Sequence, residues 1–221
     1  MELNSDPNQR VVLDTALLAW DDDRAGAVSR KPLAHAGGTP AETTGIARYP
    51  PGARWPEADG VELLVLGGGL NLVAGADISA CPAGSYLRLP PGWRGELEAR
   101  DGCTLFLKRG HLGRDDPRYS LLRPRDRVWR PGLVPGLRVL SLGAFEAAQT
   151  ALVRWDPGTR FQYHRHYGGE EILVLEGVFQ DEHGDYPAGT WLRSPHLSAH
   201  EPYSEPGCLI YVKVGHLPPA A

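Results

Sequence analysis

Three histidines and one glutamate in the C-terminal half have the residue types and spacing of a metal site. His164 and His166 are separated by one residue, Glu170 follows His166 by four residues, and His200 comes later in the chain. On one strand, His164 and His166 would point to the same side with Cα atoms about 6.8 Å apart. Three imidazole nitrogens and one carboxylate oxygen suit Zn, Fe(II), Mn, Ni or Cu better than Ca or Mg. The sequence therefore predicts one divalent transition metal, with Zn or Fe as first choices and Mn or Ni as alternatives.

A second glutamate stands directly beside the predicted ligand. Glu170 and Glu171 are neighbours, and successive side chains of a strand point to opposite faces. Only one of the two carboxylates can therefore face the histidines. We assign Glu170 to the metal and Glu171 to a structural role.

Other side chains are expected to line a pocket beside the metal. Gln162 precedes His164 by two residues, so period-two alternation places it on the same side. Trp191 and Tyr203 are aromatic residues close in sequence to the predicted ligands. No Ser/His/Asp constellation, phosphate-binding loop or CxxC pair is present, so catalytic residues stay unknown.

The chain carries an internal repeat. Residues 82–90 (PAGSYLRLP) match residues 187–195 (PAGTWLRSP), and residues 102–112 (GCTLFLKRGHL) match residues 207–217 (GCLIYVKVGHL). Both pairs share one offset of 105 residues, and a repeat of this kind marks two copies of one structural unit. The sequence predicts an N-terminal domain over residues 1–112, a charged, proline-containing connector over 113–128 and a C-terminal domain over 129–221.

Short apolar runs separated by turn residues fill both copies, which predicts an all-β fold of sandwich or barrel type. A short helix is a weaker expectation over residues 142–148. The predicted strands are residues 62–66, 86–89 and 104–108 in the first copy, and 149–155, 171–175, 190–193 and 209–214 in the second.

The predicted ligands occur in one copy only. Glu170 aligns with Val61, His200 with Gly95 and His164 with Ala58, and the His166 region falls in a shortened loop of the first copy. Packing requirements alone do not explain four coordinated differences. We therefore expect one metal ion in the C-terminal domain and none in the N-terminal domain.

Composition limits the classes of function. The net charge of −4 argues against nucleic acid as a partner. No apolar run reaches 18 residues, so no membrane span is expected, and the acidic, polar N-terminus is unlike a signal peptide. Three scattered cysteines do not form a disulfide framework, and a reducing, cytoplasmic location fits them best. Cys103 and Cys208 repeat before apolar runs and are expected to be buried as small hydrophobes.

The spacing Gly158-x5-His164-x-His166-x3-Glu170-x6-Gly177 resembles the first motif of the cupin superfamily. Pro187-x-Gly189 followed by His200 resembles the second motif, although the interval before the histidine is longer than usual. That departure is similar to ChrR-like cupins, and the resemblance covers nearly the whole chain. It implies a bicupin of two tandem jelly-roll β-barrels, with metal in the C-terminal barrel only.

The resemblance also implies two kinds of function. One is a metal-containing module that senses a small molecule or an oxidant. The alternative is a dioxygenase like acetylacetone dioxygenase, a cupin that uses iron on three histidines. A third option for such a site is an isomerase or hydrolase that uses water bound to Zn or Mn. The family's namesake is an anti-sigma factor with an extra zinc-binding helical domain carrying His-x3-Cys-x2-Cys, which this sequence lacks. We therefore expect a small-molecule ligand, a homodimer as one form of assembly, and no sigma-factor partner by the namesake's route.

Overall fold

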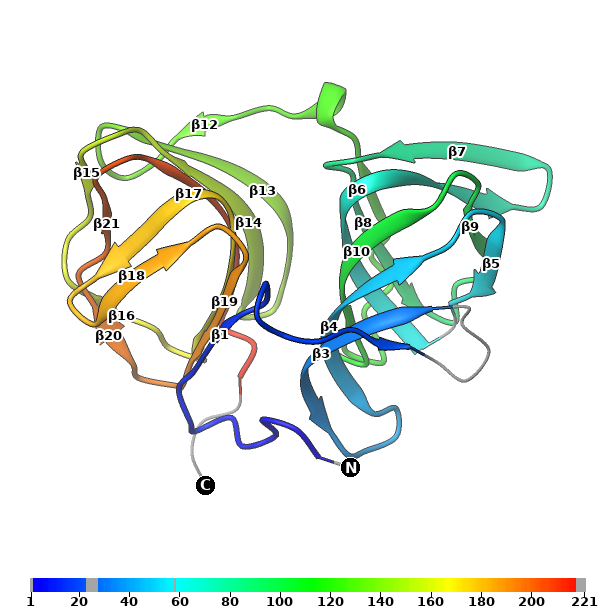
Figure 1. Cartoon of the computed structure of the whole chain (residues 1–221), viewed down its shortest axis with the longest axis horizontal. Coiled ribbons are helices and arrows are strands. Elements are labelled where there is room, and N and C mark those ends of the chain that lie inside the picture. Colours follow the sequence, from blue (N-terminus) through cyan, green and yellow to red (C-terminus); the bar gives the residue numbers. More distant parts are fainter. Residues whose placement is uncertain (1, 23–27, 58, 218–221) are drawn as a thin grey trace. The chain divides into compact units, whose positions relative to one another are not determined.

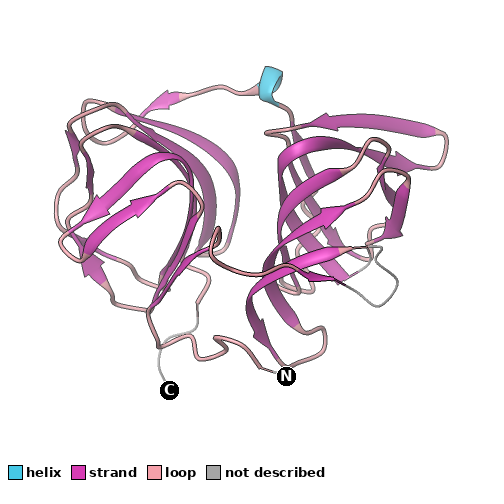
Figure 2. Cartoon of the chain, in the orientation of Figure 1, coloured by secondary structure: helices cyan, strands magenta, loops and turns pink. Residues whose placement is uncertain are grey.

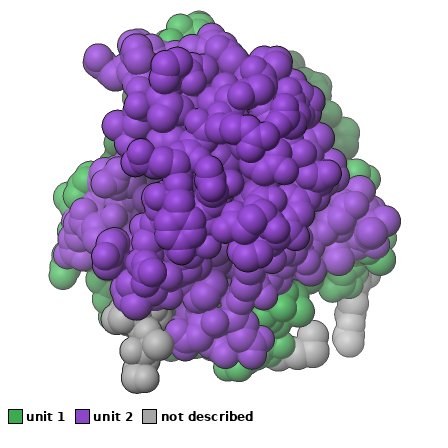
Figure 3. Space-filling view, turned by 90° about the vertical axis from the view of Figure 1, so that its left-hand side faces the viewer, with its two compact units in different colours: residues 1–5, 19–127 green, residues 6–18, 128–221 purple. Residues whose placement is uncertain are grey.

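The computed structural model describes residues 2–22, 28–57 and 59–217. The chain divides into two compact units, which Figure 3 colours separately. Unit 1 comprises Met1–Ser5 and Ala19–Arg127, and unit 2 comprises Asp6–Leu18 and Val128–Ala221. The described residues form strands and connecting loops with a single short 3₁₀ helix (Figure 2).

Unit 1 is built from ten described strands, which run antiparallel and curl into a barrel (Figure 1). The longest strand, β6, pairs with β8 and β10 along its first part and with β7 and β9 along its last part. The elements are β2 (Asp21–Asp22), β3 (Ser29–Ala36), β4 (Glu42–Tyr49), β5 (Ala53–Pro56), β6 (Asp59–Ala74), β7 (Asp77–Pro82), β8 (Tyr86–Pro91), β9 (Glu96–Ala99), β10 (Cys103–Arg109), β11 (Ser120–Leu122) and the 3₁₀ helix η1 (Pro124–Asp126).

Unit 2 repeats this plan with ten described strands and an additional pair, β16 and β20. Its longest strand, β17, pairs with β19 and β22 and then with β18 and β21. The elements are β1 (Val11–Asp14), β12 (Arg130–Pro131), β13 (Leu137–Phe145), β14 (Ala148–Trp155), β15 (Thr159–Arg160), β16 (His164–Arg165), β17 (Glu170–Asp181), β18 (Gly184–Pro187), β19 (Thr190–Ser194), β20 (Ala199–His200), β21 (Tyr203–Ser204) and β22 (Cys208–Val214).

The two sheets have the same strand order, which confirms the predicted all-β fold of two tandem barrels. Unit 1 has the order β11-β8-β6-β10-β4-β3-β2, and unit 2 has the order β1-β19-β17-β22-β14-β13-β12. Every strand predicted from the repeat lies within one of these elements. The repeat in the sequence is therefore a repeat of one barrel topology.

The edge strands β1 and β11 occupy equivalent positions but come from unexpected parts of the chain. β1 pairs with β19 of unit 2, although it lies near the N-terminus. β11 pairs with β8 of unit 1, although it lies in the predicted connector. The compact units thus differ in extent from the predicted segments 1–112, 113–128 and 129–221. Residues Asp6–Leu18 belong to the second barrel, and most of the predicted connector belongs to the first.

A glycine lies at the bend of each long strand, where no other residue fits. Gly68 in β6 has φ +67°, and an added Cβ would lie 2.3 Å from the Gly102 carbonyl oxygen. Gly177 in β17 has φ +71°, and its Cβ would lie 2.0 Å from the Gly207 carbonyl oxygen. Both the left-handed backbone and the close approach demand glycine. Because of these bends, β6 and β17 each pair with one set of strands before the glycine and with another set after it.

Alternation along the strands separates an apolar interior from the opposite face. In β17, Ile172 and Val174 join the interior cluster together with Leu192 of β19. In β6, Val61, Leu63 and Val65 do the same in the first barrel. The residues that alternate with them, such as Glu171 and Leu173 in β17, point the other way.

The short helix expected over residues 142–148 is wrong. This segment contains the end of β13, a tight turn and the start of β14, and Phe145 is paired with Ala148. Glu146 has φ +51°, which continues a hairpin turn and breaks a helix. Along the described part of the chain, no helix has the length and apolarity needed to cross a membrane.

Candidate metal centre

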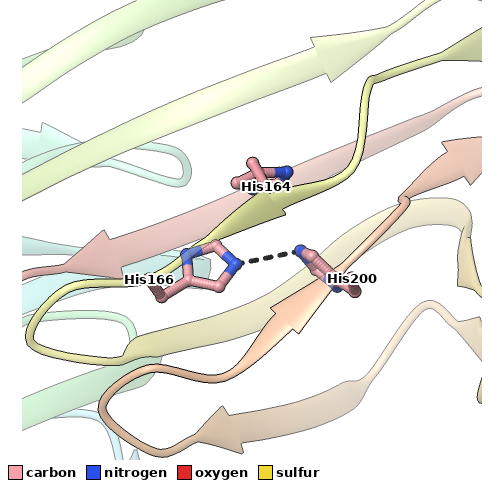
Figure 4. Close-up of side chains that lie close together, drawn as sticks. All are labelled: His164, His166 and His200. Atoms are coloured by element: carbon pink, nitrogen blue, oxygen red, sulfur yellow. Dashed lines mark hydrogen bonds between the residues drawn. The ribbon is translucent and has the colours of Figure 1, made fainter.

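Three histidines of unit 2 converge on one point, as Figure 4 shows. His164 on β16 lies directly opposite His200 on β20, and His166 follows β16 immediately. One ring nitrogen from each histidine lies within 4.8 Å of the others. The Nε2 atoms of His166 and His200 are 3.1 Å apart. Two nitrogens bound to one tetrahedral ion would lie about 3.3 Å apart, so the described geometry is close to that of a shared ligand sphere.

Glu170 lies beside the same cluster. Its Oε2 atom is 3.5 Å from His166 Nε2 and 3.6 Å from His200 Nε2. Burial raises the pKa of Glu170 to about 7, while the neighbouring His200 works in the opposite direction. A carboxylate so deprived of water is stabilised by a cation, and a bound metal would supply one.

The electrostatics of the three histidines suit ligands. Burial, reinforced by the charges of the other two histidines, lowers the pKa of His166 to about 3. Burial also lowers the pKa of His164, although its hydrogen bond to the Gln162 carbonyl opposes this. For His200, burial acts to lower the pKa, but Asp181 and Glu170 outweigh it and raise the pKa. Neutral imidazoles at His164 and His166 keep their lone pairs for coordination.

The outward nitrogen of two histidines has a partner that fixes the ring. His164 Nδ1 is 3.0 Å from the Gln162 carbonyl oxygen, and His200 Nδ1 is 3.2 Å from Asp181 Oδ2. A proton on Nδ1 in each ring directs the Nε2 lone pair toward the cluster. Phe161 packs edge-on against His164, with ring centroids 5.0 Å apart. The Nε2 atoms of His164 and His200 are therefore already directed toward the cluster.

Trp191 does not belong to the predicted pocket. Its neighbour Leu192 faces the barrel interior, so the Trp191 side chain points to the opposite face. There its Nε1 donates a 2.9 Å hydrogen bond to Glu171 Oε1. Glu171 also lies 3.2 Å from His216 Nε2, which agrees with the structural role expected for it. The closeness of Trp191 to the ligands in the sequence therefore did not predict which face of the barrel its side chain occupies.

Tyr203 and Gln162 also lie elsewhere than predicted. Tyr203 is paired with Arg160, whose guanidinium carbon is 4.5 Å from the tyrosine ring centroid. The buried neighbours on either side of Tyr203 face inward, so the ring faces outward. The Gln162 side chain is exposed, and the residue contributes its carbonyl oxygen, to His164.

Sequence reasoning missed a buried acid next to the cluster. Asp181 accepts from His200 and also from the Tyr186 hydroxyl, at 2.7 Å. Burial acts to raise the pKa of Asp181, but hydrogen bonds from His200, Tyr186 and the His183 amide lower it below its usual value. Asp181 is therefore a charged acceptor. The repeat contained a signal for it, because the strand pairing aligns Asp181 with Leu72 of the first barrel.

The equivalent place in unit 1 is closed to these ligands. Val61 replaces Glu170 and is fully buried in the apolar core. Gly95 replaces His200, and a Cβ there would lie 2.4 Å from the Trp93 ring and 2.6 Å from the Val73 carbonyl oxygen. A histidine does not fit at Gly95. Ala58, the predicted counterpart of His164, lies outside the described residues.

An ion pair stands beside Val61 in the first barrel. Arg109 is directly opposite Val61 in the register of β10 and β6, so it points to the same face. Its Nε donates to Glu57 Oε1 and Oε2 at 2.9 and 3.1 Å, and its Nη2 donates to Tyr49 Oη at 3.2 Å. Unit 1 thus places a guanidinium where unit 2 gathers metal-binding groups.

The residues of unit 2 fit a divalent transition metal. Three nitrogens and one oxygen are the donor set that Zn, Fe, Mn and Ni accept. Burial lowers the pKa of two of the three histidines, which keeps them neutral, and Glu170 is buried beside His166 and His200. His164, His166, His200 and Glu170 are the residues that could hold the ion.

Comparison with known proteins agrees with this fold. Among solved structures, a candidate dioxygenase from Nostoc punctiforme has a TM-score of 0.75 at 16% identity, covering 94% of this chain and 83% of its own. Salicylate 1,2-dioxygenase from Pseudaminobacter salicylatoxidans has a TM-score of 0.70 at 14% identity, with coverages of 97% and 86%. Oxalate decarboxylase from Lactobacillus farciminis has a TM-score of 0.63 at 10% identity, with coverages of 95% and 87%. At such identities the likeness shows the fold alone.

Sequence comparison is more specific. No curated protein matches the chain. The family model described as the ChrR cupin-like domain matches twice, over residues 8–113 and 118–218. Each match covers one copy of the internal repeat. The chain therefore belongs to the ChrR cupin-like family and is a bicupin.

Proposed function

We propose that unit 2 binds one divalent transition-metal ion and senses a small molecule or an oxidant there. The observation that carries this proposal is the convergence of His164, His166 and His200 beside the buried Glu170. A bound ion would supply Lewis acidity, and iron would add one-electron chemistry. Zn and Fe are the metals we favour, with Mn or Ni as further candidates.

The chain's own residues divide the work at this site. His166 and His200 are buried and would hold the ion from the inside, while Glu170 would neutralise part of its charge. His164 is only half-buried, so the ion's accessible side would lie toward this residue. Phe161 beside His164 and Phe179 beside His200 would keep the surroundings apolar. Such an environment favours a neutral or anionic ligand that exchanges with water on the ion.

The nearest ionisable groups support sensing over acid–base catalysis. Asp181 is directed at His200, and the Tyr186 hydroxyl is directed at Asp181. Both groups therefore serve a ligand of the ion, and neither is free to exchange a proton with a substrate. A hydrolase or isomerase would need such a group within hydrogen-bond reach of its substrate.

A dioxygenase is the second candidate, and the donor count permits it. Three histidines and one glutamate leave two positions of an octahedron open, enough for oxygen and one substrate atom. Two of the structural relatives carry dioxygenase names. The protein would then be an enzyme of the acetylacetone-dioxygenase type, with His164, His166 and His200 holding iron.

Metal analysis followed by oxygen uptake distinguishes the two functions. The purified chain is analysed by mass spectrometry for metals, then loaded separately with Zn(II) and Fe(II), and oxygen uptake is measured with acetylacetone and with salicylate. Sensing predicts one metal per chain and no substrate-dependent uptake with either metal. Uptake by the Fe(II)-loaded chain that disappears in the His164→Ala/His166→Ala variant would instead establish the oxygenase. Absence of any metal binding would overturn both.

A further inference from the structure

The second ring nitrogen of His200 begins a chain of hydrogen bonds that leads away from the metal centre. His200 Nδ1 donates to Asp181 Oδ2 at 3.2 Å, and Tyr186 Oη donates to Asp181 Oδ1 at 2.7 Å. Arg10 Nη2 in turn donates to Tyr186 Oη at 2.6 Å. The donors approach the carboxylate from both sides, His200 from one side and Tyr186, backed by Arg10, from the other. We call these four residues the His200 relay.

We propose that Asp181 is a positioning residue of the metal centre, and that Tyr186 and Arg10 hold Asp181 in place. This inference rests on the proposed metal-binding function. Asp181 would fix His200 with its proton on Nδ1, which leaves Nε2 for the ion. Arg10 brings in the N-terminal segment, so that residues remote in sequence from the motif contribute to the site.

The positions of the strands explain how the relay is assembled. Asp181 and Phe179 are two residues apart on β17, so both side chains face the barrel interior, where Phe179 is part of the core. Tyr186 on β18 lies directly opposite Phe179 in the register of the hairpin. Asp181 and Tyr186 are each only 5% exposed. Two polar side chains are thus inserted into an otherwise apolar region.

The N-terminal segment is anchored on unit 2 at several points along its length. Thr15 Oγ1 donates to the Gly189 carbonyl oxygen at 2.7 Å, and Arg193 Nη2 donates to the Asp6 carbonyl oxygen at 2.9 Å. Between them, β1 pairs with β19. Arg10 immediately precedes β1, so this pairing determines where its guanidinium reaches. The guanidinium carbon also lies 5.7 Å from the Tyr186 ring centroid.

The first barrel shows that the hairpin itself does not require these polar groups. The pairing of β6 with β7 and β9 aligns Leu72 with Asp181 and Cys81 with Tyr186. Leu72 and Cys81 are both buried in the apolar core of unit 1. The same hairpin therefore forms with a leucine and a cysteine at these positions. A buried carboxylate costs free energy unless it is hydrogen-bonded, so its presence in the barrel with the histidines indicates a role at that site.

A local role for Asp181 explains only half of its contacts. Its Oδ1 accepts a 2.8 Å hydrogen bond from the His183 amide, as turn-forming aspartates commonly do. The turn makes no use of Oδ2, which lies 3.2 Å from His200 Nδ1. Carboxylate partners of ligating histidines typically change metal affinity by about 10- to 100-fold. The Oδ2 contact is therefore the one that an affinity measurement should detect.

The test compares metal affinity across matched variants of the full chain. Zn(II) dissociation constants are measured by competition with a chromophoric chelator, and the visible spectrum of the Co(II)-loaded chain reports coordination geometry. Asp181→Leu copies the first barrel and is expected to weaken Zn(II) binding about 10- to 100-fold and change the Co(II) bands. Asp181→Asn keeps an acceptor for His200 and is expected to recover part of the loss. Tyr186→Phe is expected to weaken binding about threefold to tenfold.

Two control variants lose a buried hydrogen bond elsewhere. Trp191→Phe removes the bond to Glu171 on the opposite face of the same barrel, and Tyr86→Phe removes the 2.7 Å bond to Glu62 in unit 1. Neither should change Zn(II) affinity or the Co(II) spectrum. If Asp181→Leu proves unfolded, Tyr186→Phe decides the question, because it removes one hydroxyl and leaves the ring.

The outcomes separate this inference from the proposed function. A wild-type chain that binds Zn(II) while Asp181→Leu and Tyr186→Phe bind it with unchanged affinity and spectrum would overturn the His200 relay and leave the metal site intact. Equal losses in the control variants would show a general structural effect and overturn it too. A wild-type chain that binds neither Zn(II) nor Co(II) would overturn the proposed metal function itself.

Discussion

Unit 1 and unit 2 have the same strand order, yet their interiors differ at one end of the barrel. In unit 2, side-chain atoms of His166, Glu170 and His200 lie 3.1, 3.5 and 3.6 Å apart, which is close enough for all three to bind one metal ion. Unit 1 has Val61 and Gly95 at the last two positions. Both units also have an apolar core cluster. The difference shows that the same barrel topology forms without counterparts of Glu170 and His200.

Unit 1 also contains features that disfavour a metal at the equivalent place. Trp93 occupies the space that a side chain at Gly95 would need. Arg109 places a positive charge on the face of Val61, and Glu57 neutralises it. A guanidinium and a metal ion repel each other. Arg109 at this position therefore disfavours metal binding, although the Glu57 carboxylate lies beside it. The comparison makes unit 1 a built-in reference for unit 2.

Among these variants, removing two of the four proposed ligands should have the largest effect on metal binding by unit 2. The His164→Ala/His166→Ala variant is expected to lose metal binding entirely, because half of the donor set disappears. Unit 1 should stay folded, which hydrogen exchange of β6 and β10 peptides would report as unchanged protection. His183→Ala is the control, since His183 lies in a hairpin turn of the same barrel and is half-exposed at its side chain. Stoichiometric metal retained by the double variant would refute the ligand assignment.

A histidine introduced at Gly95 should destabilise unit 1 without creating a metal site. The Gly95→His side chain would collide with Trp93 and with the Val73 carbonyl, at an expected cost of about 2 kcal/mol or more. Urea unfolding followed by fluorescence would measure it. Gly67→Ala is the matched control, because a Cβ at Gly67 meets nothing within 4 Å. A stable Gly95→His variant that gained a second metal would show that unit 1 is closer to a metal site than its packing indicates.

Breaking the Arg109–Glu57 ion pair of unit 1 should have a smaller effect on its free energy of unfolding. Glu57→Gln leaves the Arg109 guanidinium without a charged partner, and the expected loss is about 1–3 kcal/mol because Arg109 keeps some contact with water. Metal content should not change. Asp156→Asn is the control, since its pair with Arg138 is exposed on both sides, and no measurable loss is expected. Equal stability of the Glu57→Gln variant and the wild type would show that this pair contributes nothing to unit 1.

The equivalent cysteines of the two barrels should behave alike and react slowly. Burial raises the pKa of both Cys103 and Cys208 to about 11. Since the thiolate is the reactive form, only about one thiol in a thousand would be reactive at pH 8, and the reactive fraction should rise about tenfold per pH unit. Ellman's reagent applied to native and urea-unfolded protein measures this. Rapid reaction of Cys208 alone in the native protein would point to a thiol-based oxidant sensor in place of a metal-based one.

Much of the fold and the ligand cluster could be predicted from the sequence. The repeat aligned three predicted strands of the first copy with three of the second, because a shared topology preserves apolar spacing and the glycines at strand bends, Gly68 and Gly177. The His164, His166 and His200 cluster was predictable because coordination imposes a specific spacing on specific residue types. Alternation also separated Glu170 from Glu171.

Contacts between segments distant in sequence could not be predicted. The β1 strand is apolar enough to be recognised as a strand, but nothing in its residues identifies β19 as its partner. Trp191 and Tyr203 were assigned to a pocket by proximity in sequence, while the face that each occupies depends on the register of its strand. Asp181 was overlooked because it belongs to no motif. Aligning it with Leu72 would have identified it as a polar residue in an apolar position.

Metal stoichiometry of the wild-type chain tests the central claim most directly. The purified protein is stripped with a chelator, reloaded with Zn(II), freed of excess metal and analysed by mass spectrometry, with native mass spectrometry giving the number of ions on each chain. The account predicts one ion per chain, held in unit 2 and lost when His164 and His166 are both replaced. Two ions per chain, or one ion that persists in that double variant, would contradict it.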